Sequence, residues 1–426
     1  MNLPDAQAMT TLPHGAPVKR RLVLNEATIA MFGAAVLLLG AVLWADRSPL
    51  TEKTDFSVTY IGARMVHEKQ GARLYDLAEQ GKMKASLLPN AEPLVYEHPP
   101  FEALLLSPLG GLPYRTAYLI WGLFNASIWL ILPWLVRPYA PVPHDGLGYV
   151  ALWFLFAPLG IALYQGQSSL ILLLLFTATF IELKHKHDLR AGLWLGLGLF
   201  KFQFVLPFVL ILLLRRKWRF VAGFSLMATL LAILSVVAVG GQGIVSYLRL
   251  LANIISHPAN ISLGSATDMA TVHGFIHALL NNLVNATTAL LIVGTISTAL
   301  ILFTVWRWNR SEQTSAQFDL MFAAAIASSL VLGSHMFAHD LSPLLLAMFL
   351  AAAHLPRHRW VASRAILFAT LVLFWMPALY FVLIASHRMY LLFLALVIFA
   401  IAAMTLAAKP GIPLADAGSL RQNVAD

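Results

Sequence analysis

Residues 27–44 read ATIAMFGAAVLLLGAVLW, and residues 54–60, a short distance after them, read TDFSVTY. The first stretch holds no charged side chain and is long enough to cross a hydrocarbon core of about 30 Å. The basic residues 19–21 precede it, which by the positive-inside rule keeps its start in the cytoplasm. The second stretch therefore opens a polar segment on the outer side of the membrane, with Asp55 near its start.

The composition extends this interpretation to the whole chain. Of the 426 residues, 59% are hydrophobic and 12% are charged, against about 25% charged in soluble domains. Apolar runs of about 20 residues recur between short charged connectors, which is typical of an all-α polytopic membrane protein. The formal charge of +9 does not indicate a nucleic-acid partner, because the basic residues lie mainly at the ends of the apolar runs. The absence of cysteine excludes disulfides and cysteine nucleophiles.

The runs predict about 12 membrane helices with both termini in the cytoplasm. The predicted regions are a poorly ordered cytoplasmic tail, one membrane domain and a second cytoplasmic tail, at residues 1–23, 24–408 and 409–426. Two long outer loops are expected, at residues 46–100 and 240–282. In the first loop, residues 56–68 and 77–88 have helical periodicity with mixed polarity, which favours helices lying on or near the membrane surface.

The segment 189–214 has an unusual charge pattern. Arg190 lies at its start and the basic residues 215–219 follow its end. One straight span would place one of these clusters outside. We therefore predict two short helices that form a hairpin, with Lys201 at the apex, because irregular backbone at membrane depth is tolerated where protein or a water-filled cavity covers it.

Asp55 is the leading candidate for the group that performs the chemistry. The outer connectors contribute polar groups, whereas the inner ones offer basic residues and acids typical of solvated helix ends, so the active face is predicted to be the outer one. A carboxylate in a cleft near the membrane is partly desolvated, which raises its pKa toward a value useful for a general base. The alternative is that Thr54 or Asp55 caps the helix starting at Phe56. Glu97 is the chief rival as base.

Several cations in the outer segments could bind a phosphate. Arg64 shares a helix face with Tyr60 and matches phosphate oxygens bidentately, although snorkelling into lipid headgroups explains it equally well. Lys201 lies inside an apolar segment, where a charge is costly and usually faces a cavity or a partner. Its alternative role is a structural ion pair with Asp340. The amides of Gln165, Gln167 and Gln203 are expected at similar depth.

Two histidines near the end of the chain offer further contacts. His335 and His339 are four residues apart, a spacing that would place both on one helix face and could indicate a metal. No carboxylate cage accompanies them, so hydrogen bonds to sugar hydroxyls or phosphate are favoured, or helix capping by Asp340. Likewise, Tyr96, Glu97 and His98 either close the cleft or fix the turn before Pro99-Pro100.

These motifs together resemble glycosyltransferase family 87, also known as DUF2029. The matching residues are Asp55-Phe-x-x-x-Tyr60, Leu74-Tyr75-Asp76, Tyr96-x-His98-Pro99-Pro100-Phe101, Gly166-Gln167-Ser168, Ala191-Gly192-x-x-x-Gly196, Lys201 and His339-Asp340-Leu341. One departure is Lys201-Phe202, where the family more usually has Lys-Pro. The resemblance covers roughly residues 50–350.

The resemblance implies a GT-C fold and similarity to polyprenyl-phosphate-mannose-dependent alpha-1,2-mannosyltransferases of the bacterial cytoplasmic membrane. It implies an outer-face active site, a polyprenyl-phosphate sugar donor, a glycolipid or glycan acceptor, and Asp55 as catalytic base. We expect an inverting transfer of a hexose such as mannose, with Lys201, Arg64, His335 and His339 at the donor phosphate. The polyprenyl tail is expected in a groove between membrane helices that faces the membrane lipids. No metal or cofactor is expected, because fixed cations can neutralise a monophosphate leaving group.

A secondary transporter or a flippase for lipid-linked sugars is the alternative from another class. It would be expected to carry inverted repeats and several buried acids at the midplane of the membrane. In this chain the acids cluster in the outer loops instead, and no internal repeat is evident. A non-enzymatic scaffold would leave Lys201 in its apolar segment without a reason.

Overall fold

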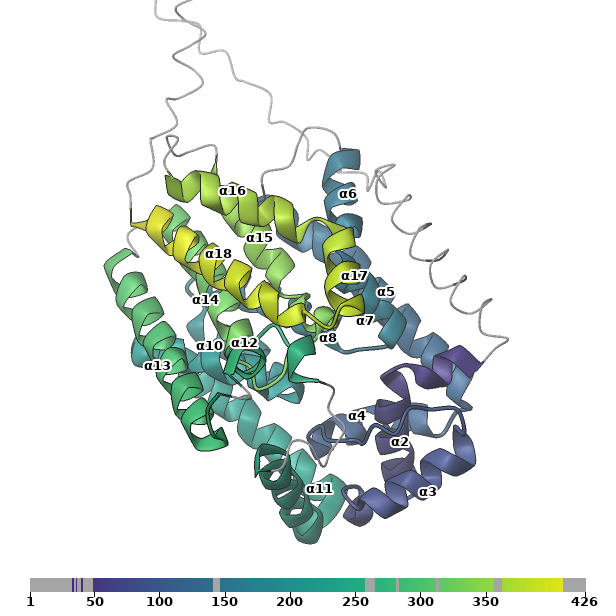
Figure 1. Ribbon diagram of the computed structural model, residues 1–426. Helices are drawn as coiled ribbons and strands as arrows, with labels where there is room; N and C mark the ends of the chain where they lie inside the picture. The colour runs from purple at the N-terminus through teal and green to yellow at the C-terminus, as the bar shows by residue number, and fades with distance from the viewer. Residues whose placement is uncertain are drawn as a thin grey trace, which may run out of the picture.

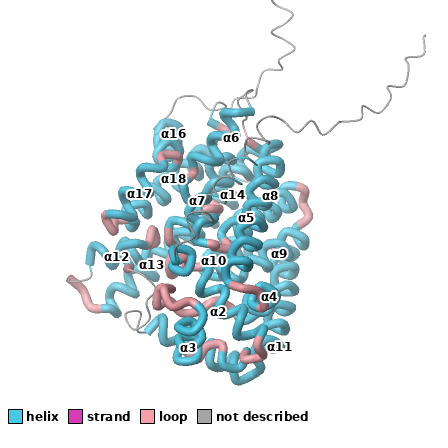
Figure 2. The backbone as a smooth tube through the Cα atoms, turned by 90° about the vertical axis from the view of Figure 1, so that its right-hand side faces the viewer, coloured by secondary structure: helices cyan, strands magenta, loops and turns pink. Residues whose placement is uncertain are grey.

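The computed structural model describes residues 49–140, 146–256, 265–280, 283–311, 314–355 and 362–408, together with the single positions 33, 36 and 40 (Figure 1). Throughout this part of the chain the secondary structure is helical, without a β-strand (Figure 2). The predicted first span at residues 27–44 and both predicted tails lie outside the described residues. The predicted all-α architecture is confirmed.

The helices follow one another closely. In chain order they are α2 (Phe56–His67), α3 (Leu77–Leu87), α4 (Pro100–Gly110), α5 (Tyr114–Val136), α6 (Gly146–Leu155), α7 (Ala157–Gln165), α8 (Ser169–Lys184), α9 (Asp188–Gly196), α10 (Phe202–Leu214), α11 (Trp218–Ser256), α12 (Val272–Leu280), α13 (Ala286–Ser311), α14 (Ser315–Val331), α15 (Leu344–Ala352), α16 (Ala362–Phe374), α17 (Pro377–Ala385) and α18 (Leu392–Ala407). The 3-10 helices that matter below are η2 (Gly71–Arg73), η4 (Leu197–Lys201), η6 (Ala266–Asp268) and η7 (Ala338–Leu341).

The chain is a membrane protein. Five of its described helical segments are long and apolar enough to cross a bilayer, and two bent pairs of helices bring the total to seven if each pair is one span. The two pairs combine α6 with α7 and α16 with α17, and each bends at a proline that starts the second helix. The figure of about 12 membrane helices stays a prediction.

The segment Asp188–Leu214, which by length and composition could be one span, turns back on itself near Lys201, as the predicted hairpin would. A Cβ added at Gly198 would lie 3.1 Å from the side chain of Val205, whereas residues seven apart in a straight helix are separated by roughly 10 Å along the axis. The start of α9 also lies against the start of α11, since a Cβ at Gly192 would lie 2.0 Å from the carbonyl oxygen of Phe220. Both basic ends of the segment therefore lie together, with Lys201 at the opposite end.

The position of residues 56–68 on or near the membrane surface stays a prediction, but these residues do not form an exposed helix. Helix α2 is buried along most of its length, because α4 covers it closely on one side. A Cβ at Gly110 of α4 would lie 2.6 Å from the backbone of Ala63, so only glycine permits this approach. The other predicted surface helix, α3, is mostly exposed. Both views show α2, α3 and α4 grouped at one end of the molecule beside α11 (Figures 1 and 2).

Helix α14 forms the centre of the bundle. Every residue from Asp319 to Val331 is buried, and α10, α13, α15 and α18 pack around it. Helix α8 serves to define the two ends of the molecule. It begins at Ser169 and ends at Lys184, about 22 Å away at 1.5 Å per residue. We call the end that contains Ser169 the site end and the end that contains Lys184 the basic end.

Candidate active site

Asp55 lies at the start of α2 but does not cap it. Its backbone is already helical (φ −62°, ψ −23°) and its side chain accepts no bond from the amides of the first turn. The carboxylate oxygen Oδ2 instead accepts a hydrogen bond of 2.8 Å from Nε2 of Gln167, and the backbone N–H of Asp55 donates to Oε1 of Gln165 at 3.2 Å. The side chain is 26% exposed. The carboxylate is therefore free to meet a substrate, and capping by Asp55 is contradicted.

A glycine turn brings the two glutamines to Asp55. Helix α7 ends at Gln165, and Gly166 follows in the left-handed conformation (φ +65°), which favours glycine. A Cβ at this position would also lie 2.6 Å from Cβ of Phe56. Trp121 donates from Nε1 to the Gly166 carbonyl at 2.7 Å. The turn is therefore pressed against the first residue of α2.

Lys201 lies at the apex of the α9–α10 hairpin and is buried. Its ammonium donates to Oδ1 of Asp340 at 2.5 Å and to Oε1 of Gln167 at 3.1 Å. The side chains of Lys201 and Asp340 are only 6% and 1% exposed. The structure thus contains the ion pair that was the alternative role for Lys201. An ammonium has three donors, and these two bonds leave one for a substrate.

Gln167 connects the two charged groups. Its amide nitrogen donates to Asp55 while its amide oxygen accepts from Lys201. A primary amide has both a donor and an acceptor end, so the two charges orient it in one way only. The result is a continuous row of polar contacts from Asp55 through Gln167 and Lys201 to Asp340.

His339 lies between the two ends of this row. Its Nδ1 is 3.9 Å from Oδ2 of Asp55, and its Nε2 is 3.4 Å from Oδ2 of Asp340. Asp340 is held further by the hydroxyl of Ser169 at 3.3 Å and by the backbone N–H of Phe337 at 3.1 Å. The second of these bonds is the capping role expected of Asp340, here at the start of η7.

Beside this row lies a second group of ionisable side chains. Oε1 of Glu97 is 3.8 Å from Nε2 of His335, and the same nitrogen is 3.2 Å from Nε2 of Gln203. Burial raises the pKa of Glu97 above its usual value, and the charges of His98 and Lys201 oppose this rise only in part. The interaction between Glu97 and Lys201 joins the two groups into one site.

The pKa values of His335 and of the neighbouring His98 are shifted in opposite directions. Burial lowers the pKa of His335 to about 4, so its ring is neutral at neutral pH. Burial also lowers the pKa of His98, but the nearby Glu102 carboxylate more than compensates, and the net pKa of His98 lies above its usual value. The Nδ1 of His98 is 2.5 Å from Oε2 of Glu102.

Glu102 is a residue that the sequence analysis missed. It lies four residues after His98 in the stretch HPPFE and is a charged residue inside the apolar helix α4. Both features were visible in the sequence: a spacing of four places side chains on one helix face, and a charge in an apolar run needs a partner.

The expectation that His335 and His339 share a helix face is wrong. His335 lies in a non-helical stretch before η7, and His339 lies within η7. The break turns His335 toward Glu97 and His339 toward Asp55. Among the described residues, no group of three or more histidine, aspartate and glutamate side chains has a geometry that could hold a metal ion.

Three predicted contacts lie away from Asp55. Arg64 is nine residues along α2, about 13 Å from Asp55 at 1.5 Å per residue, and it donates to Glu68 at 2.6 Å and to the Gly110 carbonyl at 3.0 Å. Tyr60 donates its hydroxyl to the Leu112 carbonyl at 2.7 Å. Tyr96 is 1% exposed and donates to the Pro99 carbonyl at 3.1 Å. These three side chains stabilise the packing of α2 and of the segments on either side of α4.

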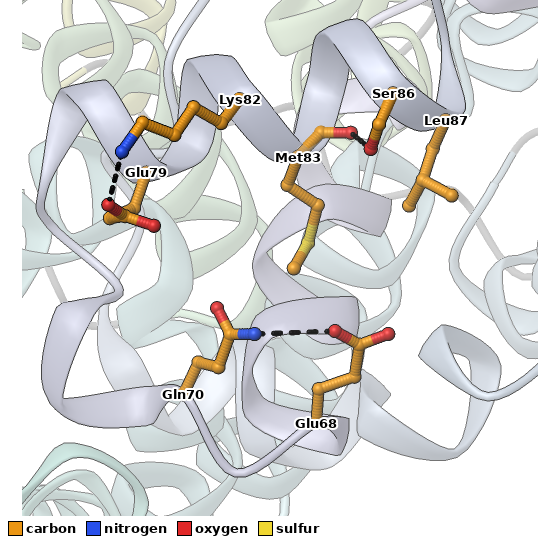
Figure 3. A pocket seen from close by; sticks show the side chains of 7 residues that line it. All are labelled: Glu68, Gln70, Glu79, Lys82, Met83, Ser86 and Leu87. Carbon is orange, nitrogen blue, oxygen red and sulfur yellow. Dashed lines mark hydrogen bonds and ion pairs between the residues drawn. The ribbon is translucent and has the colours of Figure 1, made fainter.

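A surface pocket lies near Arg64 and not at the site. It is lined by residues of α3 and of the segment that follows α2, namely Glu68, Gln70, Glu79, Lys82, Met83, Ser86 and Leu87 (Figure 3). The polar side chains in this pocket bond to one another or to backbone, as in the pair of Lys82 with Glu79 at 2.8 Å. Glu68 is 13 residues from Asp55, so the pocket does not belong to the Asp55 group.

Comparison with known proteins gives one match. The family model of glycosyltransferase family 87 matches residues 96–334, which is more than half of the chain. The matched region contains Glu97, Gln167 and Lys201, and it ends one residue before His335. No curated protein and no solved structure matches the chain.

Proposed function

Because this chain belongs to glycosyltransferase family 87, we propose that it transfers a hexose, mannose by our inference, from a polyprenyl-phosphate donor to a lipid- or glycan-linked acceptor. The transfer inverts the configuration of the anomeric carbon. It takes place at the outer face of a bacterial cytoplasmic membrane.

The environment of Asp55 is the observation that carries this proposal. A general base must be within reach of the proton it removes and must be held in a defined orientation. Two observations support this role for Asp55: its carboxylate is partly exposed, and Gln167 orients it through a bond of 2.8 Å. Asp55 removes the proton of the acceptor hydroxyl while that oxygen bonds to the anomeric carbon. The bond from this carbon to the phosphate oxygen breaks, and its electron pair leaves with the phosphate.

Lys201 supports a donor that carries a phosphate. Its third N–H is available for a phosphate oxygen, and a preformed cation in a dry site stabilises developing negative charge without reorganisation. His339 lies between Asp55 and Asp340 and is placed to contact the same group. Contacts to sugar hydroxyls are assigned to Gln165, Gln203 and Glu97, which line the same site.

The distribution of charge supports the outer location of the site. The basic end of the bundle contains Lys184, Arg215 directly after α10, and Arg307 and Arg310 near the end of α13. Arg215 is bonded to Asn309 of α13 at 3.1 Å, which joins two of these helix ends. Basic connectors stay in the cytoplasm, so the opposite end, with Asp55, faces outward.

The test is the transfer of labelled sugar in proteoliposomes from a synthetic polyprenyl-phosphate donor. Asp55→Asn keeps the size of the side chain and removes the base, and we expect kcat to fall by about 10²- to 10⁴-fold with donor binding retained. Asp268→Asn is the matched control, because Asp268 is also an aspartate of a predicted outer loop and pairs with His387 at 3.0 Å. Full activity of Asp55→Asn would rule out the assigned base.

A further inference from the structure

The donor phosphate would enter a site that is already rich in carboxylates. Asp55, Glu97, Glu102 and Asp340 all belong to the two groups described above, and the one lysine among them is paired with Asp340 at 2.5 Å. Like charges repel more strongly in a poorly solvated site than in water. A phosphate at this position therefore needs a second cation.

His335 does not supply that cation. Its pKa is lowered to about 4, and its Nε2 lies 3.2 Å from the amide nitrogen of Gln203. A neutral ring accepts this hydrogen bond, whereas a protonated ring would place two donors against each other. His335 therefore serves as a neutral hydrogen-bonding group.

His98 has the partner that a cationic histidine requires. Glu102 is 8% exposed, and among the described residues His98 is the one side chain bonded to it. Glu102 occupies the third position of α4, where the dipoles of the first helical turn favour an anion. A buried carboxylate is costly unless it is paired, so the pair is most stable with Glu102 ionised and His98 protonated.

The geometry also determines which nitrogen of the His98 ring remains free to donate. Tyr75 donates its hydroxyl to the His98 carbonyl at 2.7 Å, and Pro99 and Pro100 restrict the backbone that follows. With Nδ1 turned to Glu102, Nε2 is the remaining donor, and the side chain is 21% exposed. No described residue is bonded to this nitrogen.

The charged groups around His98 place it at the donor site. Its ring interacts electrostatically with Lys201, Glu97 and Glu102, and also with His335. The geometry agrees, because His98 directly follows Glu97, whose Oε1 is 3.8 Å from Nε2 of His335, and Gln203, two residues after Lys201, contacts the same nitrogen at 3.2 Å. The buried ring of Tyr96 lies against His98, with ring centroids 5.5 Å apart, and Tyr75 contacts both Tyr96 and Tyr247.

We propose that His98 is a catalytic residue whose Nε2–H donates a hydrogen bond to a phosphate oxygen of the lipid-linked donor, and that Glu102 is its positioning residue. This inference rests on the proposed function. In the transfer step the acceptor proton goes to Asp55 and the electron pair of the broken bond goes to the phosphate oxygen. His98 keeps its proton and stabilises the charge that develops on the phosphate.

The pairing of His98 with Glu102 determines in which direction phosphate binding changes with pH. Glu102 raises the pKa of His98, so His98 stays cationic to a higher pH than an ordinary histidine. Without the Glu102 charge, the cation would be lost at lower pH. Binding of a phosphate should therefore weaken at a lower pH in Glu102→Gln than in the wild-type protein.

The experiment measures binding of a polyprenyl methyl phosphate diester to the full-length protein in nanodiscs between pH 5.5 and about 9. This probe carries one negative charge and does not titrate in that range, so any change in affinity belongs to the protein. For Glu102→Gln and His98→Gln we expect about a tenfold loss of affinity at pH 7, the lower end of what the loss of a hydrogen bond to a charged group causes. Glu102→Asp should restore part of the lost affinity. His387→Gln is the control, because His387 also pairs with a carboxylate, that of Asp268.

The outcomes separate this inference from the proposed function. If the wild-type protein transfers sugar from the polyprenyl-phosphate donor while folded Glu102→Gln keeps the wild-type affinity and pH profile, the role of His98 and Glu102 is refuted and the function stands. A rise in the KM for the acceptor alone would also refute the contact with the phosphate. If the wild-type protein neither binds the diester nor uses the donor, both proposals fail. Thermal unfolding of each variant identifies any that is misfolded, and His98→Gln provides the second, independent variant.

Discussion

In the described part of the chain two lysines pair with buried aspartates, and comparing the two pairs gives a sharp test of Lys201. At the site end Lys201 bonds to Asp340, and at the basic end Lys184 bonds to Asp319. Removing one partner of a buried pair costs about 3–5 kcal/mol of stability. Both substitutions, Lys201→Met and Lys184→Met, keep a long side chain in the bundle and remove the charge.

Each remaining aspartate keeps other partners, which places the expected cost at the lower end of that range. Asp340 retains the hydroxyl of Ser169 at 3.3 Å and the N–H of Phe337 at 3.1 Å. Asp319 retains Nε2 of His354 at 3.1 Å. We therefore expect both variants to lose about 3 kcal/mol of unfolding free energy, seen as similar decreases in the thermal midpoint in detergent.

The two variants should differ in donor binding. In the proposed complex the third N–H of Lys201 bonds to the phosphate, and a hydrogen bond to a charged group contributes about 1.5–3 kcal/mol, equivalent to roughly a 10- to 150-fold change in affinity. Lys184 is about 22 Å from the site end of α8, so Lys184→Met should bind the donor as the wild-type protein does. The assay is the KM for the donor in proteoliposomes, together with binding of the methyl phosphate diester.

Equal donor affinity in folded Lys201→Met and Lys184→Met would refute the assignment, since Lys201 would then be a structural partner of Asp340 alone. An affinity loss of the same size in both variants would also refute it, because the loss would then come from reduced stability. The stability measurement and the binding measurement together distinguish these cases from the expected result.

Three further predictions follow from single contacts. Gly166→Ala should lower stability by at least about 1–2 kcal/mol, the cost of the left-handed conformation. It should also lower kcat, because the turn that places Gln167 moves away from Phe56. A thermal midpoint and a rate equal to those of the wild-type protein would contradict this. Tyr96→Phe should cost about 1 kcal/mol for the lost bond to Pro99 and leave the KM values unchanged, so a changed KM would show that Tyr96 contacts substrate. Folding lowers the pKa of His335 from 6.5 to about 4, so its contribution to stability is complete above pH 6.5 and is lost as the pH falls toward 4. The thermal midpoint of His335→Gln should therefore decrease less on acidification than that of the wild-type protein. An identical decrease would be inconsistent with a buried neutral ring.

Local features of the sequence predicted several elements closely. The apolar runs at residues 101–109 and 114–136 coincide with α4, Pro100–Gly110, and α5, Tyr114–Val136. Prolines start or precede both helices, and proline determines its own φ angle without help from the rest of the fold. The hairpin at Lys201 was predictable for a similar reason, because the charges at its two ends demand the same side of the membrane.

The expectations that failed depended on what surrounds a residue. The mixed polarity of residues 56–68 suggested that one face of α2 is exposed. Helix α4 covers α2 instead, because Gly110 allows the two backbones to approach. Arg64 was assigned to the donor phosphate, yet it is bonded to Glu68 and the Gly110 carbonyl. The sequence contained the spacing of Glu102 from His98, but only the fold shows that Glu102 is buried against that histidine.

The sequence by itself determined that this is an all-helical membrane protein of glycosyltransferase family 87 and which polar residues were available for chemistry, because hydropathy and charge act locally. Only the tertiary structure decided which of these residues meet. Asp55 and Gln167 are 112 positions apart, and Lys201 and Asp340 are 139 positions apart. Their meeting depends on the turn at Gly166 and on the hairpin apex packing against η7. Hydrogen bonds form over about 3 Å, a distance that separations along the chain cannot specify.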